Sequence, residues 1–482
     1  MQTVCNLCVC GQKTAAYLNG LGAVTKISVP QPSVNDNIRP EPNPERVYSA
    51  CGTSKHTLDE APMRNPMLIK ASRSAVFPFL LTTVLLVAAH AQTFTVIHAF
   101  TGQGDGGAPY AGVTLDQAGN VYGAAWIGGS HDMGTVYQLK RAGSGYTLNT
   151  LYTFANGPGG TYPKGGVTFG RGGALYGTAS QGGYDGCGVH GYIGCGIVFS
   201  LRPPSTFCNS ALCAWIETTT YAFQGVTTPD GDNPLYGEVA FDAAGNIYGT
   251  TQNDGAYGYG TAYELTRSGD TWTETVLHSF GAPGDGQYPD HNVVLDSAGN
   301  VYGTTYSGGA SGAGTVFQLV PSGSGWTENI LASFDGQDDI GGGVLAGLII
   351  DAQGNLYGAT SIAPSYDGAI FELSPSGNGF QLTVLHRFTR RNQAGVVGNM
   401  VLDAQGNLYG ATAGDGVGLN GMLFKLTHGI NGWTLTDLHD FLYLDDGGGP
   451  AGDLAMDANG NIYGTTLNGG SGNFGTVWKY TP

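Results

Sequence analysis

Short runs in which apolar and polar residues alternate recur along residues 94–482, separated by segments rich in glycine. In one representative stretch these runs are Val293–Asp296, Val301–Thr305, Thr315–Leu319 and Trp326–Phe334. Alternation with a period of two is the pattern of half-buried β-strands, and the intervening SAGN and PSGSG segments have the composition of tight turns. The pattern therefore predicts a unit of four short antiparallel strands.

The unit is repeated, as the block DQAGNVYGAA at Asp116 and its later copies indicate. A degenerate copy, GRGGALYGTA, begins at Gly170, and close copies begin at Asp242, Asp296, Asp351, Asp403 and Asp457. Four-stranded units repeated every ~40 to 50 residues are typical of β-propeller blades. We therefore predict an all-β fold, a seven-bladed β-propeller of four-stranded antiparallel blades, that forms a single domain over residues 92–482.

The two ends of this region predict how the ring of blades closes. The last unit stops at its third strand, Thr476–Tyr480, whereas the segment Phe94–Phe100 resembles the end of the fourth strand in other units. We expect the N-terminal strand to join the C-terminal blade, because this arrangement leaves no free sheet edge.

Composition supports the same fold class and excludes some partners. Glycine accounts for 82 of 482 residues, 41% of residues are hydrophobic and only 11% are charged. Such a chain is too apolar for disorder and too glycine-rich for long helices. The net charge of −17 argues against any partner held through its phosphate backbone, so we expect no nucleic acid partner.

Residues 63–91 have the pattern of a secretory signal peptide. Three basic residues precede an apolar run, Ala75–Ala89, and the small residues Ala89 and Ala91 follow as a cleavage site. The run is shorter than the ~20 residues that span a bilayer, so we predict no integral membrane segment after processing. We expect a secreted, periplasmic or extracellular protein, and interpret residues 1–62 as a mis-called start or an unstructured extension.

The repeated DxxGN segment has a structural interpretation and a metal-binding alternative. A turn of this kind uses the carboxylate to accept backbone N–H groups, glycine to supply a positive φ, and asparagine to adopt the left-handed region. We favour structural turns for Asp116, Asp242, Asp296, Asp351, Asp403 and Asp457. The tyrosine of the following YG pair is expected to pack between blades, and its glycine to mark a close backbone approach near the axis.

Four cysteines follow the signal peptide, all within the second unit: Cys187, Cys195, Cys208 and Cys213. In an exported chain an even number of cysteines indicates disulfides, and local pairs 187–195 and 208–213 would each fix one insertion. A zinc site that includes His190 is the alternative, and the sequence alone leaves the connectivity open.

Function is expected where the copies differ, since the shared residues build the scaffold. Aromatic and polar residues that vary between blades predict a sugar-binding face, with simple packing as the alternative; they are Trp126, His131, Asp132, Tyr184, Tyr257, Asp290, His291, Tyr306, Arg390 and Arg391. Aspartates in the loops between blades predict a Ca²⁺-binding rim, with a solvated rim as the alternative; they are Asp105, Asp230, Asp232, Asp285, Asp445 and Asp446. Histidines on the fourth strands, His98, His278, His386 and His439, are interpreted as half-buried structural residues.

No catalytic motif is recognisable. We therefore predict a propeller that acts as a binding protein or a scaffold, and we favour a non-catalytic role over an enzymatic one. The expected partner is a polysaccharide or a cell-surface protein, the expected state is a monomer, and no cofactor is required, Ca²⁺ being the one candidate. Two alternatives remain: a metal-dependent lyase or hydrolase with its site at the central channel, and a purely structural envelope component. An axial cluster of unlike Asp, Glu, His or Asn side chains would favour the enzyme, whereas a broad aromatic rim would favour binding.

The DxxGNxYG block, the GGxxxxGT segment and the VLHxF segment together resemble the GloVer tandem repeat, named for Gloeobacter and Verrucomicrobia. The resemblance covers residues 94–482 and implies an exported propeller-like protein without an established activity. Members often end in a surface-anchoring tail, whereas this chain ends at Pro482 directly after the last strand. More distantly the hairpins resemble NHL-like and related propellers, which include binding scaffolds and metal-dependent lactonases or lyases.

Overall fold

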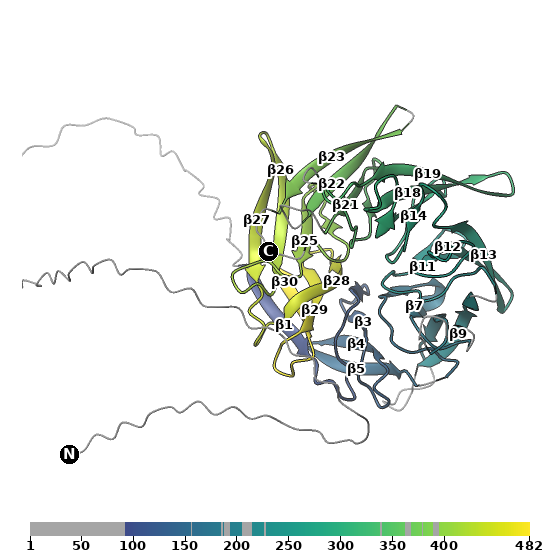
Figure 1. Cartoon of the computed structure of the whole chain (residues 1–482). Coiled ribbons are helices and arrows are strands. Elements are labelled where there is room, and N and C mark those ends of the chain that lie inside the picture. The colour runs from purple at the N-terminus through teal and green to yellow at the C-terminus, as the bar shows by residue number, and fades with distance from the viewer. Residues whose placement is uncertain are drawn as a thin grey trace, which may run out of the picture. The chain divides into compact units, whose positions relative to one another are not determined.

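The computed structural model describes residues 92–482 except 156, 185–186, 188–192, 205–214, 226–227, 338–339, 362–367, 378 and 389–394. The predicted signal peptide, residues 1–62, His190, Cys208, Cys213, Arg390 and Arg391 lie outside the described residues. Within the described part, the strands form seven four-stranded antiparallel sheets that are arranged as blades around a centre (Figure 1). No helix in this part is long and apolar enough to cross a membrane.

Blades 1 to 6 each use four strands in the order of the sequence, from the axis outward. Blades 1 to 3 consist of β2 (Val113–Leu115), β3 (Val121–Ala125), β4 (Thr135–Ala142) and β5 (Gly145–Thr153); β6 (Val167–Phe169), β7 (Leu175–Ala179), β8 (Ile197–Arg202) and β9 (Ile216–Ala222); and β10 (Ala240–Phe241), β11 (Ile247–Thr251), β12 (Thr261–Ser268) and β13 (Thr271–Ser279). Blades 4 to 6 consist of β15 (Val294–Leu295), β16 (Val301–Thr305), β18 (Thr315–Ser322) and β19 (Gly325–Ser333); β20 (Ile349–Ile350), β21 (Leu356–Ala359), β22 (Ala369–Ser376) and β23 (Gly379–Arg387); and β24 (Val401–Leu402), β25 (Leu408–Thr412), β26 (Met422–Gly429) and β27 (Gly432–Asp440).

Blade 7 closes the ring. It contains β28 (Gly448–Met456), β29 (Ile462–Asn468) and β30 (Thr476–Thr481), and its outermost strand is the N-terminal β1 (Thr93–Ala99). The strands β1 and β30 pair in antiparallel register from Thr93 opposite Thr481 to Ala99 opposite Thr476. In Figure 1 the purple N-terminal strand accordingly lies among the yellow C-terminal ones. The predicted seven-bladed fold and its closure are confirmed.

The strands differ from the predicted ones mainly at the outer hairpins. In blade 4 the third strand extends to Ser322 and pairs with a fourth strand that begins at Gly325. Only two residues remain in the turn, although the PSGSG segment suggested a longer one. Pro321 is tolerated within the strand, since it stands at the far end of the hairpin, where pairing ends one residue later.

The repeated aspartate stabilises the turn between the first two strands. In blade 4, Asp296 Oδ1 accepts hydrogen bonds from the N–H groups of Ala298 and Asn300, both at 2.9 Å. Its Oδ2 accepts from Asn300 Nδ2 at 2.7 Å and from the Tyr302 hydroxyl at 2.9 Å. Burial opposes ionisation of Asp296, but these donors outweigh it and lower the pKa of the carboxyl. The same four donors are arranged around Asp116, Asp351, Asp403 and Asp457.

The tyrosine and glycine of the YG pair act on opposite sides of the second strand. Tyr122 of blade 1 packs against Phe169 of blade 2 with ring centroids 5.1 Å apart, so the tyrosine lies between blades. The glycine does not mark an approach of backbones near the axis. A methyl group added to Gly358 would lie 2.6 Å from the ring of Phe371, its cross-strand partner. Glycine is needed here because an aromatic ring of the third strand covers the second strand.

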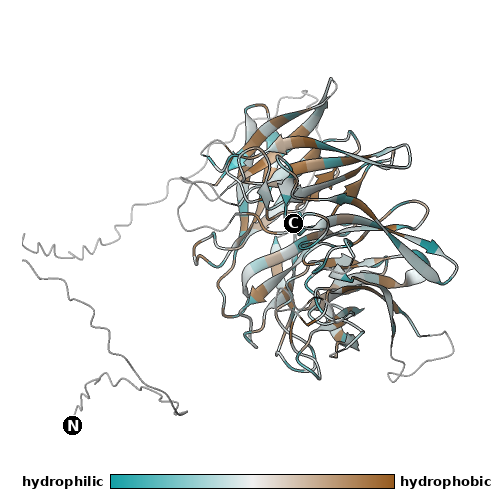
Figure 2. Cartoon of the chain, turned by 45° about the vertical axis from the view of Figure 1, so that its right-hand side comes forward, coloured by the Kyte–Doolittle hydropathy of each residue, from teal (hydrophilic) through white to brown (hydrophobic). Residues whose placement is uncertain are grey.

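The core is divided among the contacts between consecutive blades. In the described part of the chain, buried apolar side chains form seven clusters, and each cluster joins one blade to the next. The cluster between blades 7 and 1 contains Tyr463 and Val477 together with Val121 and Tyr137, so the closing contact is packed like the others. Figure 2 shows hydrophobic stretches within the strands of these blades.

The closure of the ring by β1 can be tested by a substitution of Phe94. Its ring stacks on His439 of blade 6 at 3.6 Å and contacts Phe441 and Trp478 at 5.5 and 5.6 Å. We predict that Phe94→Ala lowers the free energy of unfolding by about 2 kcal/mol, less than for a fully buried ring, since a large, partly buried ring is lost. Denaturant titration measures the change, and Thr93→Ala on the exposed end of the same strand is the control. Equal stability of the two variants would contradict the assigned closure.

Candidate functional site

Two sets of loops meet on one face of the ring. In blades 1, 2, 3, 4 and 6, the segment that leads into the blade pairs with the end of the second strand or with the segment that follows it. The pairs are the bridges Gly107 with Ile127, Thr161 with Gln181, Asp232 with Asn253 and Val396 with Thr412, and the short strands β14 (Gly286–Gln287) and β17 (Ser307–Gly308). Loops from different blades therefore surround one end of the axis.

The segments just before the innermost strands form the narrowest part of the ring. Neighbouring blades touch here, since a methyl group on Gly237 would lie 2.8 Å from the His291 carbonyl carbon and one on Gly165 would lie 2.7 Å from the Gly237 carbonyl oxygen. The position four residues before the turn aspartate lies at this narrowest part, and we call the seven residues at this position the axial ring. From blade 1 to blade 7 it is occupied by Gly112, Gly166, Glu238, Asn292, Gly347, Asn399 and Asp453. Three blades thus leave space, and four blades fill it with polar side chains.

Two carboxyl groups share this axial ring. Glu238 extends over Gly166, whose added methyl group would lie 2.6 Å from the Glu238 carboxyl carbon, and Asp453 lies against Gly112. One oxygen of Asp453 accepts a 2.6 Å hydrogen bond from the N–H of Asn399. Burial, and then the negative charge of Asp453, raise the pKa of Glu238 well above its ordinary value. Burial also raises the pKa of Asp453. A proton or a bound cation would therefore relieve the electrostatic repulsion between these two carboxyl groups.

A cavity of about 300 Å³ opens directly beside this ring. Asp453 and His291 contribute polar atoms to it, and Leu345 and Val397 contribute apolar walls. The remaining lining residues include Tyr110, Tyr236, Ala413, Pro450, Ala451, Leu467 and Asn468. A mostly apolar cavity with a few polar groups, at the lower end of the size range of ligand pockets, is a candidate small-molecule site.

Aromatic rings line one side of the cavity. Tyr110 of blade 1 and Tyr236 of blade 3 are stacked, with centroids 4.8 Å apart, and Trp126 approaches Tyr110 edge-on at 6.5 Å. The ammonium of Lys164 in blade 2 lies 4.9 Å from the Trp126 ring centroid and 5.5 Å from that of Tyr236. Burial lowers the pKa of Lys164. Blades 1 and 3 thus contribute three aromatic rings, Tyr110, Trp126 and Tyr236, which we call the aromatic wall. Blade 2 contributes the ammonium of Lys164, which contacts two of these rings.

His291 and Asp290 form a buried pair at the cavity. The His291 Nδ1 atom is 2.7 Å from Asp290 Oδ1, and the imidazole lies 5.8 Å from the Tyr236 ring. Burial opposes protonation of His291, but the charges of Asp290 and Asp453 outweigh it and raise the pKa of the imidazole. A proton can therefore be held at this histidine next to a cavity that could receive a ligand.

The structure brings together only part of the predicted sugar-binding set. Trp126, Asp290 and His291 belong to the aromatic wall or the cavity. The other described members lie in separate loops between second and third strands, where they are exposed: His131, Asp132, Tyr184, Tyr257 and Tyr306. Tyr306 lines a second, smaller hollow with Ala313 and Gly336. Arg390 and Arg391 lie outside the described residues.

Sequence reasoning missed the residues that form the centre: Tyr110, Lys164, Tyr236, Glu238, Asn292, Asn399 and Asp453. A signal for them exists. When the seven units are aligned on the turn aspartate, the positions four and six residues before it vary between blades while their surroundings repeat. These positions form no motif within one unit, because each unit contributes a single residue to each position.

The aspartates of the predicted Ca²⁺ rim are not brought together. Among the described residues, no cluster suited to a metal contains two of the six. Asp105 accepts from the Thr101 N–H at 2.9 Å, Asp230 from the Tyr221 hydroxyl at 2.8 Å, and Asp446 from the Leu442 N–H at 3.0 Å. These three carboxylates stabilise their own loops. Asp232 is fully buried near Asp254 and Cys187, and Asp445 is exposed.

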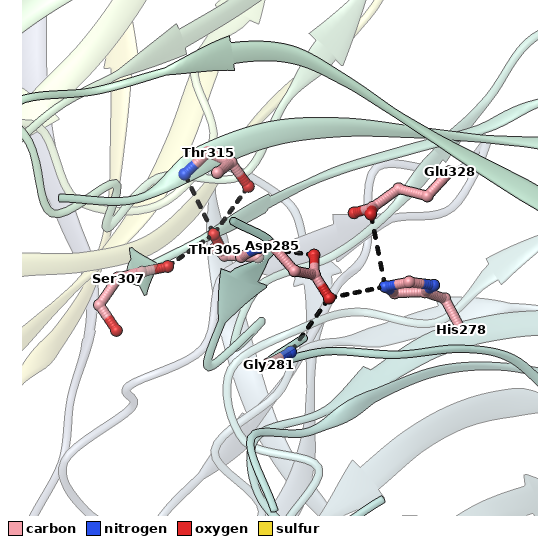
Figure 3. A network of polar contacts seen from close by, with 8 residues as sticks. His278, Gly281, Asp285, Thr305, Ser307, Thr315 and Glu328 are labelled. Atoms are coloured by element: carbon pink, nitrogen blue, oxygen red, sulfur yellow. Dashed lines mark hydrogen bonds and ion pairs between the residues drawn. The ribbon is translucent and has the colours of Figure 1, made fainter. Parts of the chain in front are cut away.

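The fourth-strand histidines pair with the same loop carboxylates. His278 Nε2 lies 3.0 Å from Asp285 Oδ2 and 3.5 Å from Glu328 Oε2 of the next blade (Figure 3). Asp285 also accepts a 3.0 Å hydrogen bond from the Gly281 N–H. Burial opposes protonation of His278, but the two carboxylates raise its pKa. His98 with Asp105 and His439 with Asp446 repeat the pair at 3.3 and 3.0 Å.

One disulfide is present in the described part of the second unit. Cys187 is bonded to Cys195, and both residues are buried, as the local pairing predicted. The bonded cysteines lie beside the segment that leads into blade 3, since the added methyl group of Gly225 would contact the Cys187 sulfur. The second predicted pair, Cys208 with Cys213, lies outside the described residues.

Comparison with known proteins identifies a repeat family. The profile of the Gloeobacter/Verrucomicrobia repeat matches residues 189–392 and 362–482. No curated protein matches the chain. Among solved structures, the extracellular domain of a hybrid two component system from B. thetaiotaomicron is 14% identical with a TM-score of 0.48; the match covers 80% of this chain and 39% of that one. A protein of unknown function from Dyadobacter fermentans is 11% identical with a TM-score of 0.42, over 80% and 96% of the two chains.

The contacts between the outer strands predict a pH dependence at Glu274. Burial, and then the charge of Asp230, raise the pKa of Glu274 from 4.5 to about 7. A raised pKa means that the folded protein binds the proton more tightly than the unfolded chain, so this contribution is present below pH ~4.5 and is lost as the pH rises through ~7. We predict that Glu274→Gln reduces the loss of unfolding free energy between pH 5 and 8 by about 2 kcal/mol. Denaturant titrations across this range measure it.

The matched control is Asp270→Asn, whose carboxylate is fully exposed on the neighbouring turn. Its pH profile should overlay that of the unsubstituted protein. A Glu274→Gln profile that also overlays it would show that Glu274 does not take up a proton on folding.

Proposed function

Because the chain belongs to the Gloeobacter/Verrucomicrobia repeat family and its repeated residues build the scaffold, we propose that it is an exported, non-catalytic binding protein whose ligand contacts the positions where the repeats differ. The ligand is a saccharide, held in the axial cavity beside Tyr110, Tyr236 and His291. A disulfide supports export, since such bonds persist in oxidising compartments.

The observation that carries the proposal is the aromatic wall next to polar groups within one cavity. The stacked rings of Tyr110 and Tyr236 offer a flat apolar surface, on which the C–H face of a sugar ring can rest. His291, Asp453 and Asn468 line the same cavity and can exchange hydrogen bonds with sugar hydroxyls. Apolar walls with a few fixed polar groups give both affinity and orientation.

The size of the cavity narrows the kind of saccharide. A volume of about 300 Å³ is small for a ligand pocket and does not admit a long chain lying across the ring. The proposed ligand is therefore a short oligosaccharide or the end of a polysaccharide, which enters from the loop face. Recognition of a chain end would leave the remainder of the polymer outside the cavity.

A second candidate function is a metal-dependent lyase or hydrolase with its site at the central channel. The observation in its favour is the axial group of unlike side chains, Glu238, Asn292, Asn399 and Asp453, with the His291–Asp290 pair alongside. Perturbed carboxyl and imidazole pKa values in a concave site are a feature of acid–base chemistry. The binding role is preferred because the cavity is mainly apolar and aromatic.

The test is binding of short oligosaccharides of defined composition, by calorimetry, to the protein and to Tyr236→Ala. We predict at least a tenfold loss of affinity in the variant, equivalent to about 1.4 kcal/mol, because the stacked ring that supports the sugar is removed. The control is Tyr257→Ala, which removes a 54% exposed ring from a loop outside the cavity. A saccharide recovered chemically unchanged after incubation supports binding; cleavage supports the enzyme.

A saccharide that binds equally to Tyr236→Ala and to the unsubstituted protein would place its site elsewhere. Failure of every saccharide would instead favour a cell-surface protein as partner. Exposed apolar side chains near the contact of blades 6 and 7 would then be the first surface to substitute; they are Val417, Leu419, Leu442 and Leu444.

A further inference from the structure

Two amide oxygens converge at the narrowest part of the ring. Gly347 of blade 5 lies between Asn292 of blade 4 and Asn399 of blade 6. A methyl group added to Gly347 would overlap the Oδ1 atoms of both asparagines. The two oxygens therefore point at one place, which exists because blade 5 has no side chain there.

Neither of these oxygens has a hydrogen-bond partner among the described residues. Asn399 is only 9% exposed, so its Oδ1 atom is withdrawn from bulk water and aimed into the ring. Buried polar atoms in proteins are nearly always paired, and each exception calls for an explanation, of which a bound water or ion is one. Two carbonyl-type oxygens that face each other need a donor or a cation between them.

Negative charge surrounds the same ring. Asp453 follows Asn399 around the axis and accepts a hydrogen bond from its backbone N–H, and Glu238 reaches inward from blade 3 across Gly166. His291, which lines the adjacent cavity together with Asp453, is already paired with Asp290 at 2.7 Å. Lys164 directs its ammonium to the rings of Trp126 and Tyr236. Two carboxyl groups thus belong to the same axial ring as the two amide oxygens, with little compensating positive charge.

We propose that this axial ring binds one Ca²⁺ ion through the side-chain oxygens of Glu238, Asn292, Asn399 and Asp453. Calcium takes six to eight oxygen ligands from carboxylates, amide and backbone carbonyls and water, and it accepts irregular geometry. Zinc prefers nitrogen and sulfur, which this ring lacks, and magnesium demands a compact octahedron that side chains from four separate blades fit poorly. The cavity beside Asp453 gives the ion a path to solvent.

Among the described residues, His278 with Asp285 and Glu328 is a further cluster of potential ligands and a weaker candidate. Its imidazole already pairs with both carboxylates, and Asp285 also accepts the Gly281 N–H. One oxygen of this cluster, Glu328 Oε1, lacks a hydrogen-bond partner in the described chain, whereas at the axis two such oxygens converge on one place.

The test is a calorimetric titration of the chelator-treated protein with Ca²⁺ alone. We expect one ion per chain, and at least a tenfold loss of affinity in Asp453→Asn and in Gly347→Ala. The first variant removes a charge while keeping an oxygen to accept the Asn399 N–H. The second adds one methyl group where the two amide oxygens converge, at a glycine whose φ is not in the left-handed region.

Matched controls separate the axial ring from general effects. Asp445→Asn removes an exposed carboxylate of the loop between blades 6 and 7, and Gly325→Ala adds a methyl group that meets no atom within 4 Å. Both should bind Ca²⁺ like the unsubstituted protein. Circular dichroism and thermal unfolding without Ca²⁺ verify that each variant is folded; Asp453→Asn provides the test if Gly347→Ala is not.

Absence of Ca²⁺ binding to the unsubstituted protein, or equal binding by Asp453→Asn, would overturn the proposal. Ca²⁺ binding that is lost in His278→Ala and kept in Asp453→Asn would also overturn it and assign the ion to the outer cluster. The inference does not rest on the proposed saccharide. Titration with Ca²⁺ in the absence of saccharide, and with saccharide in the presence of chelator, keeps failure of one proposal distinct from failure of the other.

Discussion

Close approach of seven backbones around one axis is the constraint on which the rest of the structure depends. Segments of neighbouring blades come so near that Gly165, Gly237 and Gly452 cannot carry a side chain without meeting the next backbone. The position four residues before the turn aspartate varies between blades, and the seven residues at this position share the space at the axis. Because glycine occupies it in three blades, Glu238, Asn292, Asn399 and Asp453 can extend into the ring from the other four. The close approach of the backbones therefore limits the side chains at the axis to these four polar ones.

The rest of the ring uses polar side chains for a different purpose. Each turn aspartate, such as Asp296, is saturated by donors of its own hairpin, and loop aspartates such as Asp105 and Asp446 are saturated by nearby N–H groups and histidines. A carboxylate satisfied in this way stabilises the fold and has little capacity left for a ligand. The two asparagine oxygens at the axis lack such partners in the described part of the chain, and they converge on one place beside Gly347.

Much of the fold could be predicted from sequence, because a blade is a local unit. Its turn, its YG pair and its strands lie within about fifty residues, so their pattern is legible and repeats seven times. Even the closing pair of β1 with β30 followed from one missing strand. The candidate site could not be predicted in the same way. Asn292, Asn399 and Asp453 belong to different units and become neighbours only when the ring closes, and the rings of Tyr110 and Tyr236 meet across an entire blade.

The central claim is that binding occurs at the axis, where the repeats differ, rather than on the acidic loops of the rim. The most direct measurement is an anomalous difference map from crystals of the protein grown with a lanthanide, which replaces Ca²⁺ at oxygen sites. The account predicts one dominant peak beside Gly347, within bonding distance of Asn292, Asn399 and Asp453. A dominant peak at Asp445 or another rim aspartate, with none at the axis, would contradict it.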